Sequence, residues 1–336
     1  MMQPYPNGPP DLEPAMSTPT LRSRIIGSII GTCISDALGV YAEFSTREAR
    51  DADPIKEMRG HGTWNQPVGT WSDDSSMTLA AADVLVRKGW DLEAVMDSFV
   101  SWYDHATWTA HGVNFDCGNA TRAAIAKRKA GFPASQCGGT SLSSNGNGSL
   151  MRCMPLNVYA LFSNPHHIER FAREGSALTH AHDRSTYTCV THARMLSPLA
   201  NGRSIREALA MAVGGMLLGT EDKREFARLE DGSIFAAARR DIQSGGYCIH
   251  SLESAVWCLH QTETLGLVGT EAFAHSVLAA VNLGSDTDTT AAITGALSGW
   301  IHGAEALPLE WQRVIAREAD VVKLAVDFAD TCLMEG

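Results

Sequence analysis

Two short acidic motifs, far apart in the sequence, carry the residue types best suited to chemistry. One is Ser72-Asp73-Asp74 and the other is Asp286-Thr287-Asp288-Thr289, and each follows a glycine and leads into an alanine-rich helical run. Together they offer four carboxylates and at least two hydroxyls. Oxygen ligands of this kind bind hard divalent cations such as Mg²⁺ or Mn²⁺. The two motifs therefore predict a site for two such cations and a metal-dependent hydrolase.

A helix cap is the simplest alternative interpretation of each motif, because Ser or Asp at a helix start accepts hydrogen bonds from free backbone N–H groups. One carboxylate suffices for a cap, whereas the adjacent Asp73 and Asp74 repel each other unless a cation neutralises them. The second motif is not an EF-hand loop. Counted from Asp286 as position 1, it has no Gly at position 6 and no Glu at position 12. We favour metal binding for both motifs.

Two further carboxylates precede the first motif. Glu43, taken alone, is expected to be an ordinary solvated residue. Asp36 stands inside an apolar helical run, and a buried carboxylate needs a hydrogen-bond partner. We expect Asp36 to accept a structural hydrogen bond from the main chain or from a serine.

A glycine-, serine- and asparagine-rich stretch, residues 138–149, interrupts the helical pattern and runs into Leu150-Met151-Arg152. A glycine loop at a helix start offers free N–H groups to a phosphate, although this one lacks the Walker A lysine and the dinucleotide fingerprint. By composition alone the stretch could equally link two domains. Because the acidic motifs fall on either side of it, we favour one domain with an internal functional loop.

Histidine and the remaining acidic residue give weaker signals. His180 and His182 are two positions apart, which does not place them on one helical face, so zinc is not expected. His180 is as compatible with a core role as with a pocket. Asp116 opens another helical run and could simply cap it.

The composition describes an ordinary globular protein, with 44% apolar and 19% charged residues. A net charge of -11 argues against nucleic-acid binding, which needs a basic face. The most membrane-like stretch, residues 25–42, contains Asp36, which would cost about 2.5 to 3.5 kcal/mol at the centre of a membrane helix. We predict a buried helix there and no membrane contact.

The compartment is predicted from the cysteines and from the start of the chain. The eight cysteines form no Cys-x-x-Cys pair, which is typical of buried thiols in a reducing compartment. Residues 1–20 are proline-rich and lack the basic and apolar regions of a signal peptide. We predict a cytoplasmic protein.

Apolar residues recur at helical spacing almost throughout the chain after residue 20, and no alternating run predicts a strand. We therefore predict a flexible arm at 1–20 and a single compact all-α domain at 21–336. The predicted helical runs are 25–34, 77–86, 92–102, 120–130, 168–178, 187–199, 205–218, 226–242, 255–265, 272–283, 291–301 and 311–328.

Assembled in order, these segments resemble the ADP-ribosylglycohydrolase family over roughly residues 25 to 300. Their joint presence is far more specific than any one of them. The matching stretches are Gly31–Gly39 with Glu43, Gly69–Ser75, Gly146–Arg152, Leu178–His180 and Gly284–Thr290.

The resemblance implies an all-α orthogonal multi-helix fold around a cleft with two Mg²⁺ ions, or Mn²⁺ in their place. Relatives commonly have Thr at the position of Ser72, and serine keeps the hydroxyl ligand. The implied metal ligands are Glu43, Ser72, Asp73, Asp74, Asp286, Asp288 and Thr289. The implied ADP-ribose-binding residues are Gly118, Asn145, Gly146, Asn147, Gly148, Ser149, Leu150, Met151 and His180.

The implied reaction is hydrolysis of the bond that joins ADP-ribose to a protein side chain, with the cations holding the hydroxyls of the distal ribose. Asp74 or Asp288 would take the proton of the attacking water, and Asp116 would pair with a guanidinium leaving group. Arginine is the favoured linkage, because residues 115–119 resemble the arginine-directed branch.

Three alternatives stay open at this point. Serine-linked ADP-ribose or O-acetyl-ADP-ribose is the second choice of substrate. A catalytically silent binding relative is disfavoured by the intact acidic motifs, and a binuclear phosphohydrolase would normally add histidine ligands. Some bacterial relatives are immunity proteins against ADP-ribosylating toxins, which makes residues 1–20 a candidate contact for a toxin partner.

Overall fold

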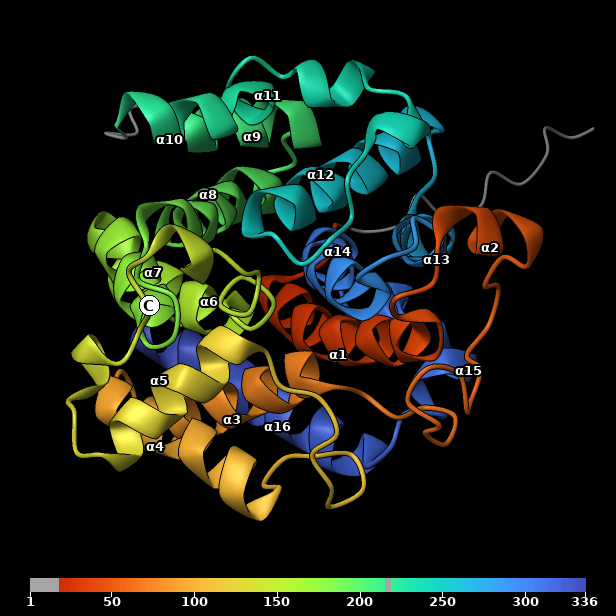
Figure 1. Cartoon of the computed structure of the whole chain (residues 1–336). Coiled ribbons are helices and arrows are strands. Elements are labelled where there is room, and N and C mark those ends of the chain that lie inside the picture. The colour runs from red at the N-terminus through yellow and green to blue at the C-terminus, as the bar shows by residue number, and fades with distance from the viewer. Residues whose placement is uncertain (1–17, 215–218) are drawn as a thin grey trace, which may run out of the picture.

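The computed structural model describes residues 18–214 and 219–336, and helices are the regular elements of this part of the chain (Figure 1). Its β-type pairings are two isolated bridges, Gly139 with His180 and Gly146 with Tyr247. The prediction of an all-α fold is therefore confirmed. The predicted arm lies mostly outside the described residues, and the division of the chain after residue 20 stays a prediction.

The α-helices are α1 Leu21–Gly39, α2 Arg47–Ala52, α3 Asp73–Lys88, α4 Leu92–His105, α5 Asn119–Lys129, α6 Met154–Ser163, α7 Ile168–Ala177, α8 Asp183–Ala200, α9 Ile205–Val213, α10 Thr220–Glu225, α11 Ala227–Glu230, α12 Cys248–Thr264, α13 Gly269–Val281, α14 Thr287–His302, α15 Leu309–Gln312 and α16 Glu318–Glu335. Short 3₁₀ turns join them: η1 Val40–Ala42, η2 Ala134–Gln136, η3 Leu142–Ser144, η4 Pro165–His167, η5 Ser233–Ala236, η6 Arg239–Asp241 and η7 Ala304–Ala306.

Helices α1 and α14 lie side by side at the centre of the molecule and approach each other through glycines (Figure 1). A Cβ atom added to Gly27 would lie 2.7 Å from the carbonyl oxygen of Gly299, and one added to Gly31 would lie 2.6 Å from that of Gly295. A side chain at these positions would force the two backbones apart, because protein interiors have no spare room. This glycine seam brings the last turn of α1 against the first turn of α14.

Asp36 in α1 holds the start of α3. Its buried carboxylate accepts hydrogen bonds from the backbone N–H of Ser72 (3.0 Å) and from both the backbone N–H (2.9 Å) and the hydroxyl (2.6 Å) of Ser75. The predicted structural hydrogen bond from main chain and serine is confirmed. Residues 21–42 are long and apolar enough to cross a membrane, but 89% of the relevant window is buried inside the protein, as predicted for a core helix.

The predicted helix at 226–242 is wrong. Helix α11 ends at Glu230, Gly232 takes a left-handed conformation (φ +71°), and the backbone N–H of Ser233 donates to the side chain of Asp231. This Asx turn and the left-handed glycine end the helix, although the apolar spacing continues beyond them. Short 3₁₀ turns follow instead.

The structure also differs from the predicted helices elsewhere. The run at 311–328 is broken between α15 and α16, where the N–H of Ala316 donates to the carbonyl of Gly69 and Arg317 has a positive φ of 52°. Helix α6 was not predicted, because its residues 154–160 are all buried and show no helical alternation of polar and apolar residues.

The glycine seam makes a direct prediction for Gly295→Ala. The new Cβ would lie 1.9 Å from the Ser35 hydroxyl and 2.6 Å from the carbonyl of Gly31, so overpacking should lower the free energy of unfolding by about 1–3 kcal/mol. Urea denaturation measures this change. Gly214→Ala is the control, because its nearest non-neighbour atom is 3.8 Å away. Equal stabilities for the two variants would contradict the seam.

Candidate active site

The two acidic motifs meet at the starts of α3 and α14. Ser72 caps α3 and accepts a hydrogen bond from the N–H of Asp74, so the cap interpretation holds for that serine. Asp286 is the cap residue of α14 but makes no capping hydrogen bond with its side chain. The hydroxyl of Thr289 donates to Oδ2 of Asp74 at 3.3 Å. Two motifs distant in the sequence thus form one cluster.

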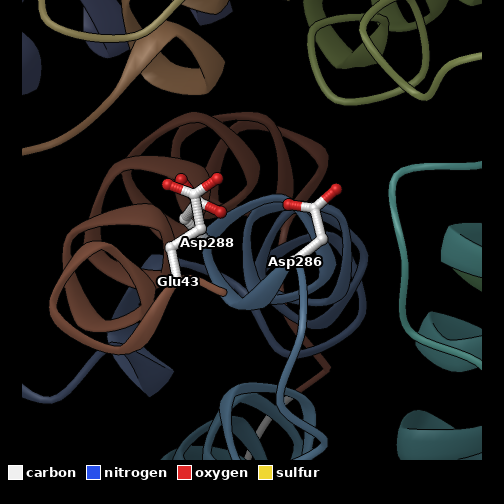
Figure 2. A group of neighbouring side chains, drawn as sticks. All are labelled: Glu43, Asp286 and Asp288. Carbon is white, nitrogen blue, oxygen red and sulfur yellow. The ribbon is translucent and has the colours of Figure 1, made fainter. Parts of the chain in front are cut away.

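Glu43 joins this cluster from the end of η1. One carboxylate oxygen each of Glu43, Asp286 and Asp288 lie within 4.8 Å of one another. Figure 2 shows the three side chains extending in the same direction from the ends of two neighbouring helices. Glu43 and Asp288 are buried, and Asp286 is partly buried. Three converging carboxylates of this kind could hold a metal ion.

A pair of backbone hydrogen bonds fixes Glu43 beside Asp286. The N–H of Phe44 donates to the carbonyl of Ser285 (2.6 Å), and the N–H of Ser285 donates to the carbonyl of Ser45 (2.7 Å). Phe44 and Ser285 both have positive φ angles, 62° and 65°, which cost energy in a residue other than glycine. Strained backbone therefore stands directly next to two of the converging carboxylates.

Two buried carboxylate oxygens lack any hydrogen-bond partner among the described residues: Oδ1 of Asp74 and Oδ2 of Asp288. The other oxygen of Asp74 accepts from the hydroxyls of Ser72 and Thr289, and the other oxygen of Asp288 accepts from the N–H of Thr289. An unpartnered buried carboxylate oxygen is costly. Both oxygens are therefore available to a cation.

Burial and mutual repulsion raise the pKa values of the clustered carboxyl groups. The pKa values of Asp73, Asp74 and Asp288 lie well above the usual range, first because of burial and then because of neighbouring negative charge. Burial, followed by the charge of Asp116, raises the pKa of Glu43 to about 8. The main neighbouring charges acting on Asp74 and Asp288 are themselves carboxylates. Divalent cations would relieve this repulsion, and the all-oxygen donor set suits hard ions.

Asp116 lies beside Asp73. Its charge is the neighbouring charge that raises the pKa of Asp73 most, and the two side chains line the same small depression. Asp116 does not cap α5, because the cap position belongs to Gly118. Its half-buried carboxylate is thus free of the capping role that the sequence left open.

The glycine loop 145–148 runs along the cluster. The side-chain amide of Asn147 donates to Oδ2 of Asp286 (2.7 Å) and to the hydroxyl of Ser251 (3.0 Å), so it orients a carboxylate. The N–H groups of Gly148 and Ser149 donate to no acceptor among the described residues. Gly148 is partly exposed, so its N–H could reach an anionic group, whereas Ser149 is fully buried.

The other residues of the predicted ADP-ribose set are buried near this loop, except Gly118. Ser149, Leu150 and Met151 are buried as whole residues. Asn145 accepts a hydrogen bond from the hydroxyl of Ser185 (3.1 Å). Gly118 is exposed at the start of α5, and a Cβ there would meet nothing closer than 3.9 Å.

His180 packs beneath the glycine loop. A Cβ atom on Gly148 would lie 3.0 Å from its ring, and its Nδ1 lies 2.8 Å from the hydroxyl of Thr179. Burial, and then the charge of Arg152, lowers the pKa of His180 to about 3, which keeps the ring neutral. The histidine therefore shapes the loop and crowds any side chain at position 148.

A second loop, residues 244–247, was not predicted from the sequence, although its Gly245-Gly246 pair could have marked it. The carbonyl of Ser244 accepts from the N–H of Asp286, and that of Gly246 accepts from the N–H of Asn147, both at 3.0 Å. Trp64 was also missed, and its indole N–H donates to the Glu43 carboxylate.

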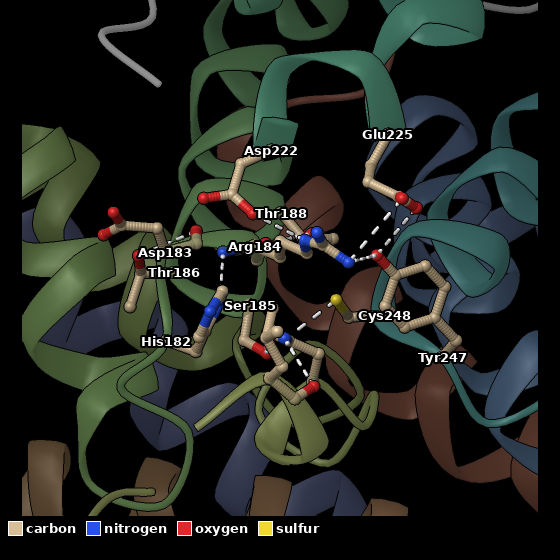
Figure 3. A network of polar contacts seen from close by, with 12 residues as sticks. His182, Asp183, Arg184, Ser185, Thr186, Thr188, Asp222, Glu225, Tyr247 and Cys248 are labelled. Atoms are coloured by element: carbon tan, nitrogen blue, oxygen red, sulfur yellow. Dashed lines mark hydrogen bonds and ion pairs between the residues drawn. The ribbon is translucent and has the colours of Figure 1, made fainter. Parts of the chain in front are cut away.

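A polar network ties helix α10 to this second loop (Figure 3). Arg184 of α8 forms an ion pair with Asp222 (2.6 Å) and donates to the hydroxyl of Tyr247 (3.3 Å). The Tyr247 hydroxyl in turn donates to Glu225 of α10 (3.2 Å). The network fixes Tyr247 beside the glycine loop.

Comparisons with known proteins agree with this arrangement. A model of the ADP-ribosylglycohydrolase family matches residues 17–335. The chain is 30% identical over 311 residues to ADP-ribosylarginine hydrolase Tri1 of Pseudomonas putida (strain GB-1), covering 91% of this chain and 78% of the relative. It is 26% identical over 318 residues to ADP-ribosyl-[dinitrogen reductase] glycohydrolase of Rhodospirillum rubrum, covering 91% of this chain and 98% of the relative.

A solved structure described as an ADP-ribosylglycohydrolase-related protein complex superposes with a TM-score of 0.76 at 27% identity. The match covers 93% of this chain and 99% of that chain. Sequence, fold and the resemblance of the acidic motifs lead to the same assignment. The chain belongs to the ADP-ribosylglycohydrolase family.

Proposed function

We propose that this chain is a Mg²⁺-dependent hydrolase that removes ADP-ribose from modified arginine side chains of proteins. The observation that carries the proposal is the pair of unpartnered, buried oxygens of Asp74 and Asp288 within a cluster of carboxylates. A relative named ADP-ribosylarginine hydrolase, at 30% identity, supports the arginine linkage. Family membership supports the reaction class.

Two divalent cations, Mg²⁺ or Mn²⁺, are proposed to bind between the starts of α3 and α14. When bound, they would supply positive charge that polarises oxygen atoms of the substrate and acidifies water. The proposed ligands are Glu43, Ser72, Asp73, Asp74, Asp286, Asp288 and Thr289.

The chain's own residues would position the substrate and move the proton. The N–H group of Gly148, which donates to no acceptor among the described residues, would hold the diphosphate, while the neutral His180 supports its loop. Asp74 or Asp288, each with one oxygen free of hydrogen bonds, would accept the proton of the attacking water. Positive charge develops on the ribose as the bond to the leaving group opens, and the surrounding carboxylates stabilise it.

Asp116 is proposed to pair with the guanidinium of the departing arginine, because it is half-buried beside Asp73 and does not cap α5. Serine-linked ADP-ribose or O-acetyl-ADP-ribose would not use this charge. A variant of Asp116 can therefore distinguish the arginine linkage from the serine linkage.

Residues 1–20 are proposed as a contact for an ADP-ribosylating toxin. Thr20 caps α1 by accepting from the N–H of Ser23, so a deletion that tests this idea should stop at residue 17. Removing residues 1–17 should weaken toxin binding in a pull-down with purified toxin while ADP-ribose release stays unchanged. Unaltered toxin binding would reject the contact.

Removing a carboxylate from the cluster should weaken Mg²⁺ binding without lowering the stability of the metal-free protein. Asp74→Asn removes one charge from a repelling cluster, so the metal-free variant should unfold at the same temperature as the metal-free parent or higher. Mg²⁺ at about 100 times its Kd should stabilise the parent by about 2.7 kcal/mol and the variant far less. Release of ADP-ribose should fall at least roughly 100-fold.

Thermal unfolding with Mg²⁺ or EDTA, together with an ADP-ribose release assay, measures these effects. Asp83→Asn on the same helix is the control, since Asp83 pairs with Arg87 outside the cluster. Equal Mg²⁺ stabilisation of parent and Asp74→Asn would refute the metal assignment.

Asp116→Asn should impair one linkage selectively. Loss of a charged hydrogen bond to the guanidinium should lower kcat/KM for an ADP-ribosylarginine peptide by roughly 10- to 150-fold. The value for an ADP-ribosylserine peptide should change much less, provided both assays contain saturating Mg²⁺. Equal losses on both peptides would show that Asp116 serves the metal site and not the leaving group.

A further inference from the structure

Three aromatic side chains form a rim at the edge of the carboxylate cluster: Phe44, Trp64 and Phe115. The ring centroids of Phe44 and Trp64 are 6.1 Å apart at 62°, and those of Trp64 and Phe115 are 5.6 Å apart at 53°. Phe44 is 65% exposed, whereas the other two rings are half-buried. Three separate segments therefore contribute to one accessible aromatic surface.

Each ring of the rim lies next to a carboxylate of the site, either in sequence or through a hydrogen bond. Phe44 directly follows Glu43, and Phe115 directly precedes Asp116. The indole N–H of Trp64 donates to the Glu43 carboxylate, and the charge of Asp116 acts on Glu43. The aromatic surface thus lies between Glu43, a proposed metal ligand, and the carboxylate of Asp116.

Packing does not account for Phe44. Its backbone is held at φ +62° by the hydrogen bond to the carbonyl of Ser285, and its side chain is left mostly exposed. A strained backbone and an exposed large apolar ring both oppose folding, and such features gather at functional sites. A ligand that covers the ring would offset this cost.

We propose that the rim is the docking surface for the guanidinium group of the substrate arginine, an inference that rests on the proposed function. A guanidinium is flat, weakly hydrated and cationic, so it stacks on aromatic faces while pairing with carboxylates. The combination of the rings with the carboxylate of Asp116 matches both properties. A serine linkage places no flat cation there, so the rim favours arginine-linked substrates.

The test uses the full chain loaded with Mg²⁺ and two product-side probes, agmatine for the guanidinium and ADP-ribose for the other product. Phe115→Leu removes the ring and should raise the agmatine dissociation constant roughly 2- to 30-fold. Phe44→Leu should act in the same direction. Phe115→Tyr keeps the ring and should retain the parent value. Trp64 is not varied, because its N–H holds Glu43.

Phe132→Leu is the matched control, since Phe132 is an exposed ring (46%) outside the rim and its loss should change neither probe. Binding is measured by calorimetry in the presence of saturating ADP-ribose for agmatine, and separately for ADP-ribose alone. ADP-ribose affinity should be the same in parent, Phe115→Leu and Phe44→Leu. The arginine-to-serine ratio of kcat/KM should fall in both leucine variants.

Two results would overturn the inference. Unchanged agmatine binding in both leucine variants would show that the rim does not dock the guanidinium. A matching loss of ADP-ribose affinity would assign the rim to the adenosine moiety, which also stacks on aromatic rings. If the parent cleaves arginine linkages but the leucine variants bind agmatine as the parent does, only the role of the rim is refuted. If the parent releases no ADP-ribose from arginine, the proposed function is refuted, and calorimetry with agmatine still tests whether the rim binds a guanidinium.

Discussion

The close contact between the last turn of α1 and the starts of two other helices determines where the acidic side chains in the first turns of α3 and α14 lie. A Cβ atom on Gly39 would fall 2.3 Å from the Cα of Asp288, and the hydroxyl of Thr287 donates to the Gly39 carbonyl at 2.7 Å. One turn earlier, Asp36 accepts the hydrogen bonds that anchor α3. A single helical segment, residues 36–39, therefore positions the first turns of both α3 and α14.

This geometry concentrates negative charge in the protein interior. Asp73, Asp74 and Asp288 are buried, and the charges that act on them most come from other carboxylates. Breaking a buried charge arrangement, or leaving it without counter-charge, costs several kcal/mol. The fold tolerates the cluster because the seam and Asp36 over-determine the backbone around it. Divalent cations are the natural counter-charge for an all-oxygen site.

Local chemistry could be predicted from the sequence, whereas contacts between segments could not. Asp73, Asp74, Asp286 and Asp288 stand in short motifs whose residue types already suggest ligands, and the burial of Asp36 required a partner. The hydrogen-bond exchange between Phe44 and Ser285 joins segments far apart in the chain, and positive φ angles in a phenylalanine and a serine leave no local signal. Trp64 was missed for the same reason.

Periodicity was also an incomplete guide to the helices. The turn at Gly232 ended a helix that the apolar spacing had extended to 242, and residues 154–160 of α6, all buried, had no pattern to detect.

The most direct test of the proposed metal centre is the location of bound metal in crystals grown with Mn²⁺. Anomalous scattering at the manganese edge should show two peaks between the first turns of α3 and α14, within coordination distance of Asp74 and Asp288. Absence of peaks there, in crystals of an active enzyme, would contradict it.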